Sequence, residues 1–139
     1  MPKLNFLTLP RKQPRTVTRT YTEPGFAEPV TFTLRSLAAD PHAMVMALEA
    51  ADALAEQYSV DWLPHPGGDR PIQVTPRIAQ DACILAAMQD GPEDEQHSAE
   101  EFIALMVTLP AVYTALLADV AALNAPAAQN GTEPDPGNA

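Results

Sequence analysis

The sequence predicts a mainly α (α+β) fold, in which an N-terminal extended arm and a β-hairpin precede a bundle of three to four helices. Two runs near the N-terminus alternate with period two and are rich in β-branched residues, and later segments repeat apolar residues at helical spacing. Alanine supplies much of the 46% apolar fraction and aromatic residues only 6%, which favours close-packed helices. We expect residues 1–15 to form a basic arm, 16–124 a single domain and 125–139 a disordered tail.

The predicted hairpin joins two runs in which apolar side chains recur on one face. Its strands cover residues 16–21 and 30–34, and the segment between them contains the turn pair Pro24 and Gly25. A two-stranded hairpin is marginal alone, so its apolar face must cover a helix or pair with another chain. That face, which is also a predicted partner-binding surface, consists of Val17, Tyr21, Val30, Phe32 and Leu34.

Two helices are predicted from a capping residue followed by proline. Asp40 begins a helix over residues 41–59, and Thr75 begins one over residues 76–89. The second helix is apolar nearly all round in its middle, so we expect it to be the central packed element. The Pro-rich segment between the two helices is predicted to be a loop that Trp62 anchors.

A third helix is predicted from a capping box. The Ser98 side chain and the Glu101 carboxylate each satisfy a free amide at the start of this helix. Pro110 removes an amide within the same apolar pattern, so the helix is expected to kink or restart near Thr108. The apolar face then continues to about Asn124.

Positive charge is concentrated at the beginning of the chain. Residues 1–35 have a net charge of +4 and residues 36–139 a net charge of −14. The acidic helical part disfavours binding to a nucleic-acid backbone, so no nucleic-acid partner is predicted. We instead expect the basic arm to attract the acidic body of another copy in a homo-oligomer. The residues predicted for this self-association are Arg11, Lys12, Arg15 and Arg19.

No group of residues in the sequence identifies a reaction, and the chain is predicted to be a non-enzymatic protein without metal or other cofactor. Glu49, Asp52 and Glu56 lie at helical spacing, but no Glu-x-x-His motif accompanies them. We interpret these carboxylates as a solvated face, with an enzyme or metal protein built on them as an alternative. Cys83, the single cysteine, lies in an apolar run and is expected to be a buried small hydrophobic residue.

The longest apolar stretch falls well short of the roughly 20 residues that a membrane span needs. The N-terminus also lacks an apolar signal core followed by a small-residue cleavage site. A cytoplasmic protein without a membrane partner is therefore expected, in the host cytoplasm if the protein is viral.

The order of segments resembles that of a known family. Residues 4–12, LNFLTLPRK, precede a strand pair that ends in VTFTLR, and acidic, alanine-rich helices follow. Over about residues 4–124 this layout resembles the tail assembly chaperones of long-tailed bacteriophages. The resemblance implies a small helical protein that coats the tape measure protein during tail construction and is absent from the finished virion.

We therefore expect a chaperone that binds the tape measure protein or another hydrophobic helical protein. Besides the hairpin face, the residues predicted to contact this partner are Val112, Leu116 and Val120 of the last helix, which equally suit the core. A small structural or adaptor protein that stays in a phage particle is the alternative.

Overall fold

A computed structural model describes residues 15–59, 62–65, 67–68 and 70–125 of the chain. Within these residues a two-stranded antiparallel hairpin is followed by four α-helices, which confirms the predicted mostly helical α+β fold. The predicted basic arm, residues 1–15, lies outside the described residues except for Arg15, and the predicted tail, residues 125–139, lies outside them except for Ala125. The elements are β1 (Thr16–Tyr21), β2 (Val30–Arg35), α1 (Pro41–Gln57), α2 (Pro76–Met88), the short 3₁₀-helix η2 (Glu93–Glu95), α3 (Ala99–Thr108) and α4 (Pro110–Asn124).

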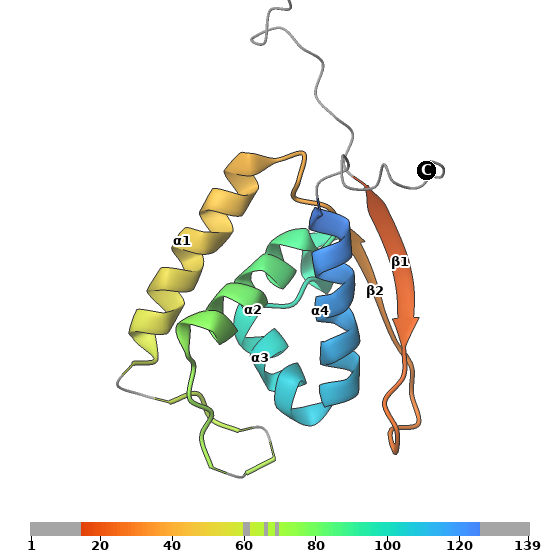
Figure 1. The fold of residues 1–139 in the computed structure, drawn as a ribbon. Coiled ribbons are helices and arrows are strands. Elements are labelled where there is room, and N and C mark those ends of the chain that lie inside the picture. The colour runs from red at the N-terminus through yellow and green to blue at the C-terminus, as the bar shows by residue number, and fades with distance from the viewer. Residues whose placement is uncertain (1–14, 60–61, 66, 69, 126–139) are drawn as a thin grey trace, which may run out of the picture.

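The two strands of the hairpin pair with Thr16 opposite Arg35 and Tyr21 opposite Val30. Threonine side chains gather on the outer face, where the hydroxyls of Thr18 and Thr33 are hydrogen-bonded at 2.8 Å. The opposite face covers the helices and carries the apolar residues, as period-two alternation requires. Figure 1 shows this hairpin and α1 on opposite sides of the molecule, with the other helices between them.

The predicted helix starts are confirmed at α1 and α2. The Asp40 carboxylate accepts a hydrogen bond from the Ala43 amide at 3.1 Å, and the Thr75 hydroxyl accepts one from the Ile78 amide at 3.2 Å. Each cap satisfies an amide that has no partner within the helix. The helices end one or two residues earlier than their sequence patterns predict.

A break at Leu109 separates α3 from α4. Leu109 has φ −133° and ψ 70°, which is not helical, and Pro110 then occupies the first position of α4. Because proline lacks an amide hydrogen and restricts the preceding residue, the chain restarts a helix here. The restart predicted near Thr108 is therefore confirmed.

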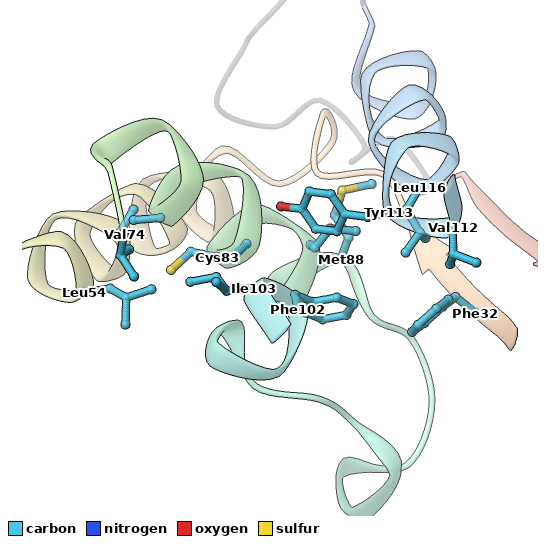
Figure 2. Close-up of a cluster of buried hydrophobic side chains, with 14 of the residues drawn as sticks. Phe32, Leu54, Val74, Cys83, Met88, Phe102, Ile103, Val112, Tyr113 and Leu116 are labelled. Carbon is cyan, nitrogen blue, oxygen red and sulfur yellow. The ribbon is translucent and has the colours of Figure 1, made fainter. Parts of the chain in front are cut away.

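The core lies where α2 meets the other helices and the hairpin. Four α2 side chains, Ala79, Ala82, Leu85 and Met88, are fully buried, which confirms α2 as the central packed element. Figure 2 shows side chains from β2, α3 and α4 meeting beside this helix. The largest fully buried side chains are Phe102, Leu34, Leu37, Leu85, Met88, Ile103, Leu116 and Val112.

The loop between α1 and α2 is anchored differently from the prediction. Trp62 is 48% exposed, whereas its neighbour Leu63 is buried. Leu63 and Ile72 exchange two backbone hydrogen bonds, at 2.7 and 3.0 Å, and both side chains join the core. The predicted anchoring by Trp62 is wrong because the turn of the loop points Leu63 inward instead.

Candidate partner-binding groove

The eight residues predicted to bind a partner lie mainly in the core of this chain. Five are buried, namely Tyr21, Phe32, Leu34, Val112 and Leu116, and three are half-buried, namely Val17, Val30 and Val120. The five buried residues belong to one core cluster, and the three half-buried residues pack against it. Contact with a partner stays a prediction for all eight, and only Val30 and Phe32 line the apolar groove described next.

An apolar groove of about 550 Å³ lies between the hairpin and α3. One wall is residues 28–32 together with Phe26, and the other is His97 with the side of α3 that carries Leu105. We call this hollow the β2–α3 groove. Phe26 is 45% exposed at its rim, whereas Phe102 beneath it is buried. A concave, largely apolar surface of this size is typical of binding sites.

Aromatic contacts set the shape of the groove. The Phe32 and Phe102 ring centroids are 5.7 Å apart, and the His97 ring lies 5.9 Å from each. These tilted and edge-on arrangements are the favoured geometries for aromatic pairs. The three rings thus join β2 to the start of α3, and all three line the groove.

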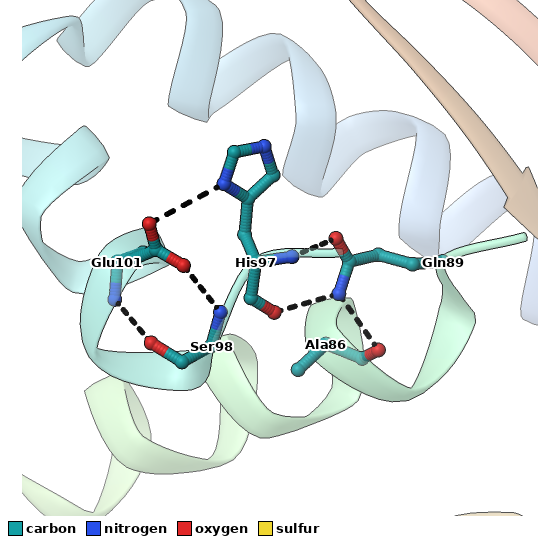
Figure 3. Close-up of polar contacts among 5 residues, drawn as sticks. All are labelled: Ala86, Gln89, His97, Ser98 and Glu101. Atoms are coloured by element: carbon teal, nitrogen blue, oxygen red, sulfur yellow. Dashed lines mark hydrogen bonds and ion pairs between the residues drawn. The ribbon is translucent and has the colours of Figure 1, made fainter. Parts of the chain in front are cut away.

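Gln89 fixes the position of His97. The Gln89 side chain is nearly buried; its amide nitrogen donates to the His97 carbonyl at 2.8 Å, and its oxygen accepts from the His97 amide at 2.7 Å (Figure 3). The same nitrogen also donates to the Ala86 carbonyl at 3.1 Å. Because every polar atom of this side chain has a partner, its burial costs little. Gln89 therefore holds the acidic loop that precedes α3 against the end of α2.

One edge of β2 is open beside the groove. The Asp90 amide donates to the Thr33 carbonyl at 2.9 Å, so the backbone groups of Thr33 point away from β1. Since this direction alternates along a strand, the amide and carbonyl of Thr31 also point away from β1. Among the described residues, neither group of Thr31 has a hydrogen-bond partner. The groove thus combines an apolar lining with unpaired strand edge.

The rim of the groove is acidic. Glu28 and Glu101 belong to its lining, and Asp90 and Glu95 line a smaller hollow that shares Thr31 with it. Within the described residues, no lysine or arginine lines either hollow. The Ser98 amide, which donates to Glu101, lowers the pKa of the Glu101 carboxyl below its ordinary value, so it stays ionised at neutral pH. A cationic ligand is favoured at this rim.

Two of the four residues predicted for self-association are engaged within the chain. The Arg15 guanidinium donates to the Ala122 carbonyl at 2.9 Å and to the Leu123 carbonyl at 2.8 Å. Arg19 lies 3.6 Å from Asp119, whose carboxylate also accepts from the Tyr21 hydroxyl. Both arginines therefore attach the hairpin to α4. Arg11 and Lys12 lie outside the described residues.

The carboxylates considered for a metal site all face solvent. Glu49, Asp52 and Glu56 are exposed on the outer side of α1. In the described part of the chain, no three His, Cys, Asp or Glu side chains converge as metal ligands. Cys83 is buried as predicted, and burial raises the pKa of its thiol. These groups thus support packing and solvation.

The sequence did not indicate the groove residues Phe26, Glu28, His97 and Leu105. The available signal was Phe26, an aromatic residue directly after a Pro-Gly turn, where a large apolar side chain is seldom buried. Glu28, His97 and Leu105 come together only when the hairpin packs beside α3. This is a contact between segments that are distant in sequence.

Comparison with known proteins gives no match, either to a family model, to a curated protein or to a solved structure. Within the described residues, no helix has the length and apolar character needed to cross a membrane.

Proposed function

We propose that this protein is a non-enzymatic assembly chaperone that binds an apolar helical segment of a larger protein in the β2–α3 groove. The observation that supports this most directly is the groove itself, an apolar hollow of about 550 Å³ with the half-exposed Phe26 at its rim. A folded chain loses stability by exposing such an aromatic side chain to water. A partner that covers Phe26 therefore binds with a favourable hydrophobic contribution.

The groove suits one face of an amphipathic helix. Such a helix presents apolar side chains three and four residues apart, and it inserts them into a hydrophobic trough. The volume accommodates a few side chains, so we expect one copy to bind weakly. Several copies along a long helical protein would bind it with far greater overall affinity than one copy.

The charge of the chain fits the same role. A net charge of −10 keeps a complex soluble while it covers apolar stripes of a partner. In the tail assembly chaperones that the sequence resembles, the partner is the tape measure protein of a phage tail. We propose a tape measure protein or a similar long helical protein as the partner here.

Co-expression tests this proposal. The full chain is co-expressed with the longest helical protein encoded nearby, and co-purification and solubility of that protein are measured. We expect the wild-type chain to co-purify with it and to increase its soluble yield. Failure of both would contradict the proposed function, and recovery of the chain from purified phage particles would favour the structural-adaptor alternative.

A matched pair of substitutions locates the binding surface. Phe26→Ser removes the exposed aromatic side chain of the groove, and Trp62→Ser removes one of similar exposure, 48%, that does not line the groove. We expect Phe26→Ser to reduce the captured partner at least tenfold and Trp62→Ser to leave it unchanged. Equal losses in the two variants would place the partner elsewhere.

A further inference from the structure

We propose that, in the absence of a partner, the β2–α3 groove of one copy is occupied by residues 4–12 of a second copy. The apolar residues 4–9 would lie in the groove, and Arg11 and Lys12 would lie at its acidic rim. This inference rests on the proposed function because the segment and the proposed partner would occupy the same groove. Its evidence is the match between the groove and a segment of the chain itself.

The first part of the match is apolar contact combined with strand pairing. Residues 4–9 have the sequence LNFLTL, with four large apolar side chains and no proline. Each residue of such a segment carries a backbone amide that can pair with an open strand edge. Thr31 provides that edge, and Phe32 and Leu105 line the hollow beside it. Strand addition beside an apolar hollow is a common way to bind an extended segment.

The second part of the match is charge. Residues 1–15 contain four bases and no acid, and two of these bases, Arg11 and Lys12, directly follow the apolar residues and Pro10. The groove has the opposite composition, with Glu28 and Glu101 in its lining and no lysine or arginine among its described residues, although the His97 ring lies 3.6 Å from the Glu101 carboxylate. Opposite charges at the end of an apolar contact favour binding and set its direction.

The geometry favours a second copy over the same chain. Arg15 lies at the end of the hairpin opposite the groove, as the pairing of Thr16 with Arg35 shows. Leu9 lies six positions before Arg15, so the chain between them spans at most about 20 Å. Asp90 occupies the edge of β2 between that end of the hairpin and Thr31, so a segment of the same chain that approaches along this edge meets Asp90 first. A segment from a neighbour meets none of these obstacles.

The contact joins two different surfaces, the N-terminal segment of one copy and the groove of the next. Such a head-to-tail contact builds rings or open chains of copies, or a closed pair when two copies exchange segments. A partner that enters the groove competes with the segment. We therefore expect partner binding to release copies from one another.

Disulfide trapping between two differently tagged full-length copies tests the contact. One copy carries Thr8→Cys, which keeps the apolar residues of the segment, and the other carries Glu28→Cys at the rim. The native Cys83 is buried with a raised thiol pKa, so it reacts slowly. The control replaces Glu28→Cys with Glu49→Cys, an exposed glutamate on α1.

We expect a mixed disulfide between the two tags with Glu28→Cys, at least tenfold above that with Glu49→Cys. Equal yields for the two positions would overturn the proposal. A chain that carries both Thr8→Cys and Glu28→Cys provides a further check. If this double variant forms only an intramolecular disulfide, in high yield and at low protein concentration, the segment binds the groove of its own chain. That result would rule out the second copy as the occupant.

Light scattering on the full chain gives an independent measurement. We expect the wild-type chain to have at least twice the monomer mass, and Phe6→Asp to reduce it to the monomer mass. Met46→Asp, at an exposed apolar residue of α1 outside the groove, should leave the mass unchanged. A monomeric wild-type chain, or equal masses for the two variants, would overturn the proposal. These masses need no partner, so they test the segment even if the co-expression experiment shows that the proposed function is wrong.

Discussion

Glu23 accepts a hydrogen bond from the Ala111 amide 2.8 Å away, although 88 residues separate the two in sequence. The same carboxylate oxygen accepts a second hydrogen bond, at 3.0 Å, from the Val112 amide. Leu109 precedes α4 and has no side chain that can cap it, and Pro110 has no amide hydrogen. A residue of the hairpin loop thus supplies the N-terminal cap of α4, and its negative charge suits that end of the helix dipole.

Replacement of this cap should destabilise the fold. We expect Glu23→Ala to lower the free energy of unfolding by about 1 kcal/mol, because two amides at the start of α4 lose their acceptor. Urea unfolding followed by circular dichroism measures the change. Glu28→Ala, in the same loop, is the control and should change it by less than about 0.5 kcal/mol. Equal effects of the two substitutions would show that the cap contributes nothing specific.

The hairpin also caps the other end of α4. Arg15 donates to the carbonyls of Ala122 and Leu123, and the Ser36 hydroxyl donates to the Leu123 carbonyl at 2.7 Å. The residues before and after β1 therefore hold the two ends of one helix, which lies beside the hairpin in Figure 1. A positive charge at the C-terminus and a negative charge at the N-terminus both suit the helix dipole.

The basic residues are therefore expected to have two different roles, with Arg15 stabilising the fold and Arg11 and Lys12 supporting self-association. We expect Arg15→Ala to lower the free energy of unfolding by about 0.5 to 1 kcal/mol, because it removes a charged group from the last carbonyls of α4. It should leave the mass of the assembly unchanged. Replacing both Arg11 and Lys12 by alanine should do the reverse, with lower mass and unchanged stability. Urea unfolding and light scattering on the same samples distinguish these results, and the opposite pattern would assign Arg15 to self-association.

Local signals predicted most of the fold. The caps at Asp40, Thr75 and Ser98 and the break at Pro110 act within a few residues, so their sequence patterns were sufficient to place the helices. Contacts between distant segments left no such pattern. Gln89, for example, is buried because its side chain hydrogen-bonds to the backbone of His97, and no local sequence pattern distinguishes it from a surface glutamine.

The groove was beyond sequence-based prediction for the same reason. Its walls are a hairpin loop and a helix about 70 residues apart in sequence, and no periodicity reports their contact. Apolar alternation in β2 indicated an inward face, but it could not distinguish the buried Leu34 from Val30 at the edge of the groove. Interface and core contain the same residue types, so only the three-dimensional packing shows to which of the two a given apolar residue belongs.

The capping box of α3 should give the protein a measurable pH dependence. Hydrogen bonding from the Ser98 amide lowers the pKa of Glu101 in the folded chain, so ionised Glu101 adds stability above its unfolded pKa of about 4.3. That stability is lost as the pH falls through the folded pKa. We expect the difference in unfolding free energy between wild type and Glu101→Gln to shrink as the pH falls from 6 to 3. The matched difference for Glu49→Gln provides the background, and parallel curves would contradict this assignment.

Two buried tyrosines provide opposite tests of hydroxyl burial. The Tyr21 hydroxyl donates to the Asp119 carboxylate. The Tyr113 hydroxyl is buried without a hydrogen-bond partner among the described residues, and this burial raises the pKa of Tyr113 to about 12. An unpaired buried hydroxyl destabilises a fold, whereas one bonded to a charged group stabilises it.

The same chemical change should therefore have opposite signs at the two positions. We expect Tyr113→Phe to raise the free energy of unfolding by about 1 kcal/mol, and Tyr21→Phe to lower it by about 2 kcal/mol, because Asp119 then loses a charge-assisted hydrogen bond. Urea unfolding at pH 7 measures both changes. A loss of stability in Tyr113→Phe would mean that a water molecule or a residue beyond the described ranges satisfies this hydroxyl in solution.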